Sequence, residues 1–422
     1  MKQKYTLEQK LMKRKMKKPN CIYGILGRVW KTLFFKKYGV KVIFHQDFRK
    51  EKGPYILISN HASRLDYMYT GLPLLPNRYN FVAGYNEFFR SHLKGVFHIA
   101  QVIPKKNFTA DIYTIKQIKR ILEQKGKIMI FPEGMSSISG SNQPVAIGTG
   151  KFIKHCQVPV YYAVIKGGYL TSPKYNLDER LGYVEVVFDQ LFTINEIEKL
   201  TPEEIEQKVN EAIYHDDYAW NLQEQHHYKT KGDIAKHLET LLYWCPKCHQ
   251  EYGMIGEKNK IYCKYCGNGA IIDDTYTMHP FDEHCVIPQT QTQWFDMQRQ
   301  NVKKEIQKED FCLTEEVELG VLPQYQYLKH QKTSKIVGTG RITFTKEGLT
   351  YEGTKEGKLY QFHINTAELP TYGMCTDVSR FYTFYHGEFV EFYPKHQTVE
   401  KWFLVTEEMH RLNGGKWQDI KK

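Results

Sequence analysis

The sequence predicts an α/β protein built in successive parts: a mainly parallel sheet flanked by helices, then a small ribbon with paired cysteines, then an antiparallel β domain. Three observations support this prediction. Short apolar runs alternate with helical stretches from about residue 53 to 215, two Cys-x-x-Cys pairs follow, and short runs rich in Tyr, Phe, Thr and Val fill the region after 325. A chain of 422 residues is too long for one core, so we expect two or three domains.

The α/β part is expected to span residues 39–215. Its strands are predicted from continuous apolar runs, because strands of a parallel sheet are buried on both faces. These runs lie at residues 55–58, 127–131, 158–165 and 183–188. A helix is predicted between them at 110–124, and another closes the part at 203–213. The polar stretch 216–243 is predicted to be a helical linker.

The ribbon is predicted at residues 244–272 from the spacing of four cysteines. Two Cys-x-x-Cys pairs stand 14 residues apart, and they consist of Cys245, Cys248, Cys263 and Cys266. Four thiolates at this spacing typically bind one zinc ion tetrahedrally and leave no position for a substrate. We therefore expect a structural zinc and no redox cofactor. The odd total of nine cysteines favours a reducing compartment over a disulfide framework.

The last part, at residues 325–415, is predicted to be a small β-rich domain. Runs such as 341–345 and 381–385 combine β-branched and aromatic residues, which favour antiparallel strands. The sequence suggests no ligand for this domain.

Basic residues are concentrated at the start of the chain. Residues 1–52 contain sixteen Lys or Arg and three Asp or Glu, whereas the rest of the chain has a net charge of −1. This distribution favours an electrostatic anchor at an anionic membrane surface over a broad nucleic-acid-binding face. A solvated basic tail without a partner is the alternative.

An amphipathic helix is predicted after this basic arm, and the two together make up residues 1–38. Its apolar residues recur at helical spacing: Ile22, Ile25, Leu26, Val29, Trp30, Leu33 and Phe34. Two interpretations stay open: the apolar face lies in a membrane interface, or it packs on the domain core. The basic arm favours the membrane. We expect no spanning helix, because no stretch reaches the ~18 apolar residues that a bilayer requires, and no secretory signal.

Polar residues follow two of the predicted strands. The run at 55–58 leads into His61 and Asp66, and the run at 127–131 leads into Glu133. Sites in open α/β sheets form at the carboxyl ends of strands, so these residues are expected to share one cleft. A neutral imidazole can take a proton from an attacking hydroxyl, and a carboxylate on its other nitrogen fixes the tautomer. A His-x4-Asp pair also arises by chance in a chain with 17 histidines, so the interpretation depends on further motifs.

At these motifs the chain resembles the glycerolipid acyltransferase family, which contains 1-acylglycerol-3-phosphate acyltransferase. The resemblance covers residues 40 to 215. The family's first motif matches Asn60, His61, Ser63 and Asp66, its third matches Phe131-Pro132-Glu133-Gly134, and its fourth matches Val158-Pro159-Val160. Found in this order, each after or within a predicted strand, the three motifs are far more specific than any one alone.

The resemblance implies a reaction and a set of residue roles. It implies transfer of a fatty acyl group from acyl-CoA or acyl-carrier protein to a lysophospholipid-like acceptor. It implies His61 as general base and Asp66 as its partner. The residues that it implies in substrate binding are Asn60, Ser63, Glu133 and Gly134. No Ser or Cys nucleophile is needed if the acceptor hydroxyl attacks the thioester directly, with backbone N–H groups as oxyanion donors.

Three departures from the family pattern concern the acceptor. The second motif reads Val102-Ile103-Pro104-Lys105-Lys106, so Lys105, or alternatively Lys106, is the candidate for the acceptor phosphate, without the bidentate fork of an arginine. The third motif often continues Thr-Arg-Ser, where this chain has Met135-Ser136-Ser137. The fourth usually has a second Pro, where Tyr162 stands. These changes leave the reaction type intact and the acceptor open.

We therefore expect a cytoplasmic O-acyltransferase, peripheral on the inner face of the cell membrane. Its expected partners are a lysophospholipid acceptor, an acyl thioester donor and the anionic membrane surface. The alternative is a catalytically inactive acyltransferase-like scaffold that binds nucleic acid or protein through its zinc ribbon. That ribbon is only mildly basic, so we do not expect nucleic acid as a partner.

Overall fold

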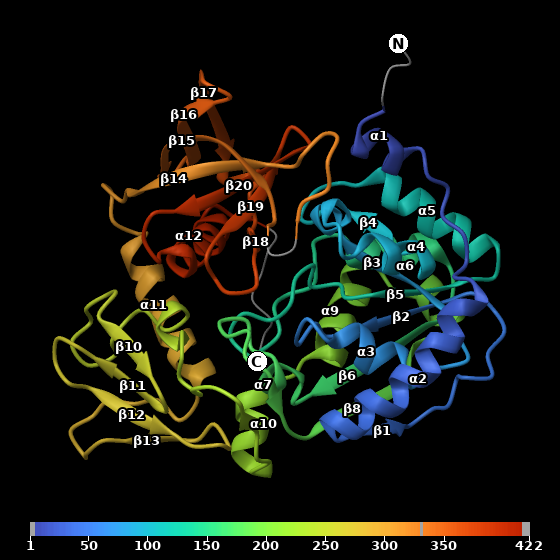
Figure 1. Cartoon of the computed structure of the whole chain (residues 1–422), viewed down its shortest axis with the longest axis horizontal. Helices are drawn as coiled ribbons and strands as arrows, with labels where there is room; N and C mark the ends of the chain where they lie inside the picture. Colours follow the sequence, from blue (N-terminus) through green and yellow to red (C-terminus); the bar gives the residue numbers. More distant parts are fainter. Residues whose placement is uncertain (1–4, 330–331, 416–422) are drawn as a thin grey trace.

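A computed structural model describes residues 5–329 and 332–415, apart from the side chain of Leu26. It contains an α/β domain, a four-stranded ribbon with a cluster of four cysteines, and an antiparallel β domain, drawn in Figure 1 in blue to green, yellow, and orange to red. The fold class predicted from the sequence is confirmed. Residues 1–4 of the predicted basic arm lie outside the described residues.

The α/β domain is built on a seven-stranded sheet with the order β1-β8-β6-β2-β5-β3-β4. The strands are β1 (Val40–Phe44), β2 (Tyr55–Ser59), β3 (Tyr79–Gly84), β4 (Ile103–Lys105), β5 (Lys127–Ile130), β6 (Val160–Lys166) and β8 (Val184–Phe192). Neighbouring strands are parallel except β6 and β8, which are antiparallel. The order places β2 between β5 and β6, so the segments that follow these three strands meet at one edge.

Helices surround this sheet. They are α1 (Leu7–Met12), α2 (Cys21–Tyr38), α3 (Asp66–Gly71), α4 (Lys94–Ile99), α5 (Ile112–Glu123), α6 (Thr149–Cys156), α7 (Gly168–Thr171), α8 (Ile194–Lys199) and α9 (Pro202–Ile213), with the 3₁₀ turn η1 (Tyr85–Phe89). Their starts follow from local sequence. Thr201 and Glu204 form a capping box before α9, with Pro202 at its first position, and Asp111 caps α5.

The segment predicted as a linker at 216–243 begins with α10 (Asp217–Glu224) and then leaves the helical conformation. It continues through β9 (Lys229–Thr230), which pairs with β7 (Arg180–Leu181), to the short turn η2 (Leu238–Thr240). The ribbon follows as β10 (Met254–Glu257), β11 (Lys260–Cys263), β12 (Gly269–Ile272) and β13 (Met278–Pro280).

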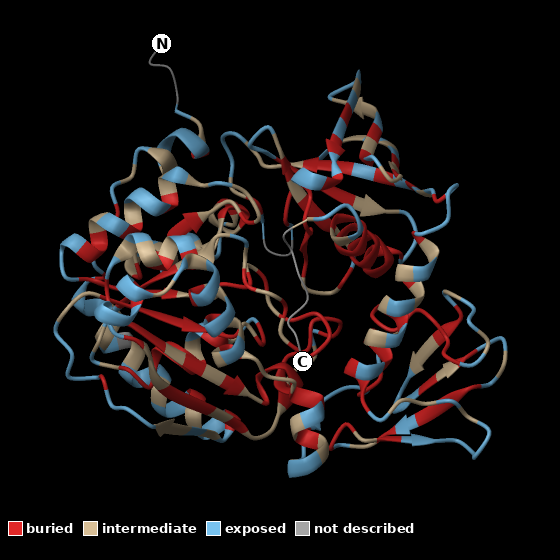
Figure 2. Cartoon of the chain, turned by 180° about the vertical axis from the view of Figure 1, so that it is seen from behind, coloured by how far each residue is buried: buried red, intermediate tan, exposed pale blue. Residues whose placement is uncertain are grey.

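The helix α11 (Gln291–Glu305) leads from the ribbon to the β domain, whose first strand begins at Leu313. The domain contains β14 (Leu313–Val321), β15 (Lys335–Phe344), β16 (Gly348–Lys355), β17 (Lys358–Asn365), η3 (Thr366–Glu368), β18 (Gly373–Met374), β19 (Phe381–Tyr385), β20 (Glu388–Pro394) and α12 (Val399–Leu412). All its pairings are antiparallel, in the order β17-β16-β15-β14-β20-β19-β18. Figure 2 shows α12 buried along nearly its whole length.

The three parts share one core. A single cluster of buried side chains runs from Tyr55 on β2 through Trp294 on α11 to Trp402 on α12. The β domain therefore packs against the α/β domain and the ribbon through buried apolar surface, which is the main favourable term in such contacts.

Helix α2 lies on the outside of the α/β domain, and most of its predicted apolar face is exposed. The exposed fractions lie between 48% and 63% for Ile22, Ile25, Val29, Trp30 and Leu33. Phe34 differs, because it is buried against Tyr38 and Tyr69. The interpretation in which the whole face packs on the core is therefore wrong for the five exposed residues. The side chain of Leu26 lies outside the described residues.

The basic arm before α2 is held along the α/β domain. Met16 is fully buried, and the carbonyls of Lys17 and Pro19 accept hydrogen bonds from Asn80 and Arg78. The side chains of Lys13, Lys15, Lys17 and Lys18 stay exposed. In the part of the chain that the structure describes, no helix is both long and apolar enough to cross a membrane.

Candidate functional site

His61 and Asp66 form a tightly held pair at the end of β2. The Nδ1 atom of His61 lies 2.7 Å from Oδ2 of Asp66, which begins α3 and is 1% exposed. Ser63 orients the carboxylate, because its backbone N–H donates to both oxygens at 2.9 Å and its hydroxyl donates to Oδ1 at 3.0 Å. Burial raises the pKa of Asp66, whereas the hydrogen bonds from His61 and Ser63 act to lower it.

The other ring nitrogen of His61 is left for a ligand. Nε2 has no hydrogen-bond partner among the described residues, and the side chain is 24% exposed. The ring stacks on Phe131 with a centroid distance of 4.6 Å and an interplanar angle of 27°. A proton on Nδ1 directed at Asp66 leaves a lone pair on Nε2, so the arrangement can accept a proton from a hydroxyl.

Glu133 connects the loop after β5 to His61. Its side chain is fully buried, and Oε1 accepts hydrogen bonds from the backbone N–H of His61 at 2.6 Å and from Asn142 Nδ2 at 2.8 Å. Its Oε2 atom accepts from the backbone N–H of Gln143 at 2.9 Å. Burial raises the pKa of Glu133 to about 8, and these three donors oppose the shift. Both oxygens are thus used within the protein.

Asn60 also acts within the protein. Its Nδ2 donates to the carbonyl of Ile165 at 2.8 Å, and its Oδ1 accepts from the backbone N–H of Ile165 at 2.7 Å. The side-chain amide thereby joins the end of β2 to the end of β6. The resemblance implies Asn60, Ser63 and Glu133 in substrate binding, but the side chain of each bonds to other residues of the protein: Asn60 to Ile165, Ser63 to Asp66 and Glu133 to His61.

Gly134 follows Glu133 in a backbone conformation that favours glycine, with φ of +81°. A Cβ atom at this position would lie 3.1 Å from the ring of Phe108. Its carbonyl accepts a hydrogen bond from Asn107 Nδ2 at 2.7 Å. Asn107 was not among the predicted site residues, although it is a polar residue just after the short strand β4, the same signal that indicated His61.

Lys105 and Lys106 directly precede Asn107, which contacts Gly134, but the ammonium groups of the two lysines bond to other carbonyls. Lys106 Nζ donates to the carbonyl of Gly387 in the β domain at 2.7 Å and pairs with Glu8 at 3.4 Å. The Lys105 ammonium donates to the carbonyl of Lys106 at 3.4 Å, and burial lowers its pKa. Neither lysine contacts His61 or Glu133 among the described residues.

A second His and Asp border the same small cavity as His61. The cavity has a volume of about 10 Å³ and is lined in part by Glu133, Asn142, His215 and Asp217. The Nε2 atom of His215 lies 2.8 Å from Oδ1 of Asp217 but has no hydrogen-bond partner among the described residues. The same Asp217 oxygen accepts a hydrogen bond from the backbone N–H of Gly167. A cavity of this size holds at most one water molecule. The His215-Asp216-Asp217 run could have been noted in the sequence as polar residues after a predicted helix.

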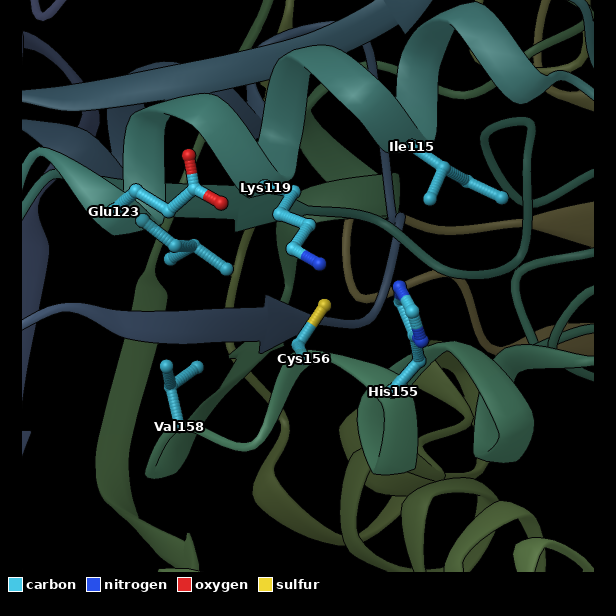
Figure 3. A pocket seen from close by; sticks show the side chains of 7 residues that line it. Ile115, Lys119, Glu123, His155, Cys156 and Val158 are labelled. Atoms are coloured by element: carbon cyan, nitrogen blue, oxygen red, sulfur yellow. The ribbon is translucent and has the colours of Figure 1, made fainter.

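A larger groove lies between α5 and α6, away from the predicted site residues. Its volume is about 210 Å³, and Figure 3 shows its lining. The residues are Ile115, Lys119, Leu122, Glu123, His155, Cys156 and Val158. Val158 stands just before β6 begins, so the groove lies at the opposite end of that strand from Ile165 and the loop that contains His61.

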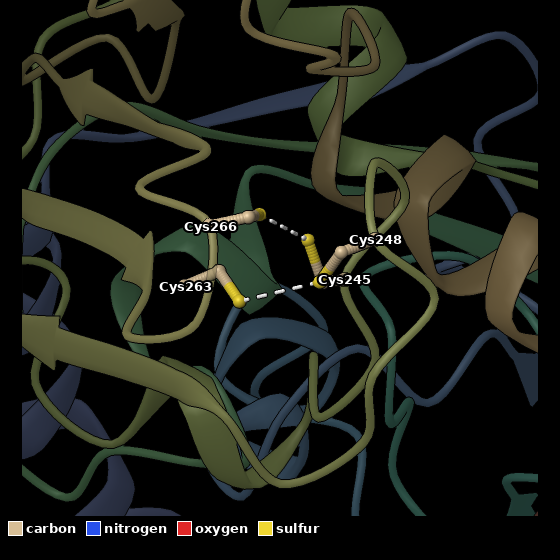
Figure 4. A group of neighbouring side chains, drawn as sticks. All are labelled: Cys245, Cys248, Cys263 and Cys266. Atoms are coloured by element: carbon tan, nitrogen blue, oxygen red, sulfur yellow. Dashed lines mark hydrogen bonds between the residues drawn. The ribbon is translucent and has the colours of Figure 1, made fainter.

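The four predicted metal ligands come together in the ribbon, as Figure 4 shows. The Sγ atoms of Cys245 and Cys266 are 3.7 Å apart, as are those of Cys248 and Cys263, and all four lie within 4.8 Å of one another. A tetrahedral ion with metal–sulfur bonds of about 2.3 Å requires sulfurs about 3.8 Å apart. The group is therefore spaced to hold one metal ion with four protein ligands.

One segment of the chain matches a known protein family. Residues 40–166 match the family model described as Acyltransferase, and this segment contains His61, Asp66 and Glu133. The acyltransferase resemblance of the motifs is thus confirmed, and the chain carries an acyltransferase domain. Among solved structures, the chain is similar to the 1-acyl-sn-glycerophosphate (LPA) acyltransferase PlsC from Thermotoga maritima, with 17% identity and a TM-score of 0.38 over 45% of this chain and 76% of that chain. No curated protein matches the chain.

Proposed function

We propose that this protein transfers a fatty acyl group from an acyl thioester, acyl-CoA or acyl-carrier protein, to a hydroxyl of a lysophospholipid such as 1-acylglycerol-3-phosphate. The observation that carries the proposal is the His61–Asp66 pair. A buried carboxylate holds one ring nitrogen at 2.7 Å while the other nitrogen is left open to a ligand. The acyltransferase domain around the pair supports the same reaction class.

In the proposed reaction His61 acts as general base. The acceptor hydroxyl attacks the thioester carbonyl as its proton moves to Nε2 of His61, and Asp66 stabilises the imidazolium that forms. The tetrahedral intermediate then collapses, the carbon–sulfur bond breaks, and the departing thiolate takes the proton from His61. An ester and a free thiol result, so no covalent enzyme intermediate is needed. Backbone N–H groups are the proposed oxyanion donors.

We assign positioning roles to three of the residues implied in substrate binding. Asn60 fixes the end of β2 to β6, Ser63 orients Asp66, and Glu133 holds the backbone of His61. Fixing a base in this way preorganises the site, which lowers the reorganisation needed in the transition state. Gly134 contributes differently, by letting the chain turn beside Phe108.

We further propose that α2 and the basic arm hold the protein on an anionic membrane surface. The exposed residues Ile22, Ile25, Val29, Trp30 and Leu33 form one face of an 18-residue helix. Lys36 and Lys37 in its last turn and the exposed lysines of residues 13–18 supply positive charge around this face. An apolar face with basic neighbours suits the boundary between headgroups and acyl chains. A lysolipid acceptor would be met at the same boundary.

The ribbon is proposed to bind a structural zinc through its four cysteine thiolates. Because protein atoms fill all four positions, the metal would stabilise the fold and take no part in the reaction. The proposed domain plan has residues 1–38 as anchor, 39–215 as catalytic domain and 216–243 as connection. Residues 244–272 belong to the ribbon, which β13 extends to Pro280, and residues 325–415 belong to the β domain, which begins with β14 at Leu313.

The proposal is tested with full-length protein, a panel of lysolipids, and acyl-CoA or acyl-carrier protein in separate reactions. A diacyl product detected by mass spectrometry is expected, and His61→Ala should reduce its rate on the order of 1,000-fold. His45→Ala is the matched control, because His45 faces Asp189 at 3.6 Å on the surface. No product from any acceptor, or full activity in His61→Ala, would leave the inactive scaffold as the better hypothesis.

A further inference from the structure

The short segment between α9 and α10 pairs with the loop that follows β5. Ser141 of this loop and Asp216 form an antiparallel bridge. Next to the bridge, the backbone N–H of Asn142 donates to the carbonyl of His215 at 3.2 Å. Residues 215–217 therefore lie directly against the loop that contributes the third acyltransferase motif.

The side-chain amide of Asn142 links this segment to Glu133. Its Oδ1 atom accepts a hydrogen bond of 2.7 Å from the backbone N–H of His215, and its Nδ2 atom donates to Oε1 of Glu133 at 2.8 Å. The same Glu133 oxygen accepts the 2.6 Å hydrogen bond from the backbone N–H of His61. A continuous series of hydrogen bonds thus runs from His215 through Asn142 and Glu133 to the main chain of His61.

Segment 215–217 is fixed in turn to the loop after β6. Asp217 is 1% exposed, and its two oxygens accept hydrogen bonds from the backbone N–H groups of Gly167 and Tyr169, each at 2.7 Å. Hydrogen bonds to a buried carboxylate are charge-assisted and do not compete with solvent. The segment is therefore a rigid support for Asn142.

Asn142 lines a cavity that is too small for a substrate. The cavity, which Glu133 and His215 also border, has a volume of about 10 Å³ and holds at most one water molecule. The side chain of His61, by contrast, is 24% exposed. An effect of Asn142 on the reaction is therefore expected to pass through Glu133 and not through contact with a substrate.

We propose that Asn142 is a positioning residue for the acyl transfer, an inference that rests on the proposed function. Glu133 is fully buried, and a buried carboxylate keeps its place only while donors satisfy its oxygens. Asn142 donates to the oxygen that also accepts from His61, so it fixes that oxygen and, through it, the main chain of the base. Asn142 takes no part in proton transfer.

Asn210 offers a matched control for the same loop. Its Oδ1 atom accepts a hydrogen bond of 3.0 Å from the backbone N–H of Val145, and its Nδ2 atom donates to the carbonyl of Glu206 at 3.1 Å. Asn210 thus joins α9 to the loop after β5 without bonding to Glu133. General loosening of the loop should therefore appear in Asn210→Ala as well as in Asn142→Ala.

The first test compares the kinetics of these two variants in the full chain. Asn142→Ala should lower kcat on the order of 10-fold with little change in KM for donor or acceptor, because the lost contact orients the base and binds no substrate. Asn210→Ala should keep both constants near those of the wild type. Equal losses of kcat in the two variants, or a loss confined to KM, would overturn the inference.

The isosteric variant Asn142→Asp adds a pH test, and it also serves if Asn142→Ala does not fold. The new carboxyl would lie beside that of Glu133, and two such groups at hydrogen-bond distance share one proton. The shared proton replaces the lost donor, whereas its release at higher pH makes the two carboxylates repel. The ionisable groups around them are the same in every variant: His61, Asp66, His215 and Asp217.

The kcat of Asn142→Asp relative to the wild type should therefore fall from about pH 6 to about pH 9. The same ratio for Asn142→Ala should stay flat, because alanine adds no titrating group. A flat ratio for Asn142→Asp would show that the residue only fills space, and the inference would fail.

Amide hydrogen exchange separates this inference from the proposed reaction. In protein carrying isotope-labelled histidine, the His61 signal is identified by its absence from His61→Ala. Exchange of the His61 amide should be faster on the order of 10-fold in Asn142→Ala and unchanged in Asn210→Ala. If the wild type transfers no acyl group yet the exchange responds in this way, the reaction is wrong and the positioning stands. If the wild type is active and His61 exchanges equally fast in Asn142→Ala, the positioning is wrong.

Discussion

The carboxylate of Glu133 accepts a hydrogen bond of 2.6 Å from the backbone N–H of His61, although the two residues are 72 positions apart in the chain. The contact joins the loop after β5 to the loop after β2, and these strands are neighbours in the sheet. The position of the proposed base is therefore set by its main chain as well as by the hydrogen bond from its ring to Asp66.

Glu133→Gln should impair both activity and stability. Both oxygens of Glu133 now accept hydrogen bonds from backbone N–H groups. A glutamine side chain has only one oxygen, so its NH₂ group would face one of these N–H groups, donor against donor. We expect a lower kcat and a loss of about 1–3 kcal/mol in the free energy of unfolding, measured by urea denaturation. Glu211→Gln on the exposed face of α9 serves as control. Unchanged kcat in Glu133→Gln would argue against the positioning role.

Asp66→Asn should reduce kcat while the fold is kept. An asparagine amide that donates to Nδ1 would move the imidazole proton to Nε2, where the acceptor hydroxyl needs a lone pair. The expected loss is on the order of 10³- to 10⁴-fold. Asp189→Asn, which alters the surface contact of His45, should leave the rate unchanged. Activity within a few-fold of wild type in Asp66→Asn would rule out the proposed tautomer.

Removal of the Lys174 charge should change stability in a pH-dependent way. Burial lowers the pKa of Lys174 to about 8, against about 10.4 in the unfolded chain. Below pH 8 the ammonium is charged in both states and the full cost of its burial is present. Between pH 8 and pH 10 the folded protein sheds the proton first and that cost is relieved. Lys174→Met should therefore be as stable as wild type or more stable at pH 7, with the difference shrinking towards pH 10.

Urea titrations of both proteins across pH 6–10 measure this difference. Lys127→Met provides the comparison, since its ammonium donates to two oxygens that would lose their partner. A Lys174→Met protein that is much less stable than wild type at pH 7 would show that the lysine is structural.

Loss of the ribbon metal should destabilise the β domain as well as the ribbon. We expect about one zinc per chain by mass spectrometry of metals and loss of that zinc when Cys245, Cys248, Cys263 and Cys266 are changed to Ser. The effect should reach the β domain, because Lys401 on α12 donates to both carboxylate oxygens of Glu251 at 3.0 and 2.8 Å. Zinc retained by the quadruple variant would place the metal elsewhere.

Charge placed on the exposed face of α2 should release the protein from anionic vesicles. The double variant Val29→Glu and Trp30→Glu is suited to a flotation assay, because both side chains are exposed and their loss leaves the contacts of Phe34 intact. We expect most of the vesicle-bound fraction to be lost. Leu359→Glu, at an exposed position in the β domain, is the control. Equal flotation of the α2 variant and wild type would remove the helix from the proposal.

Several features of this protein were accessible from sequence because they depend on local pattern. The continuous apolar runs marked β2, β5 and β6, and the regular spacing of four cysteines indicated the metal cluster. The ordered motifs around His61 and Glu133 indicated the acyltransferase domain. The first strand of the β domain, Leu313–Val321, was not predicted because its three glutamates make the segment look polar. The segment forms a strand through its pairing with β15 and β20, which lie far from it in the sequence.

The sequence by itself determined the fold class, the acyltransferase motifs and the set of cysteines, since each is a property of residue types at short spacing. Only the tertiary structure decided which polar groups satisfy one another. It showed that the Glu133 carboxylate accepts hydrogen bonds from His61, Asn142 and Gln143. It also showed that Lys106 donates to the β domain, and that Lys174 donates to Ser136, which lies 38 residues away in the chain. The physical reason is that hydrogen bonds and burial depend on groups brought together across the sheet edge, and no local pattern records which distant group arrives there.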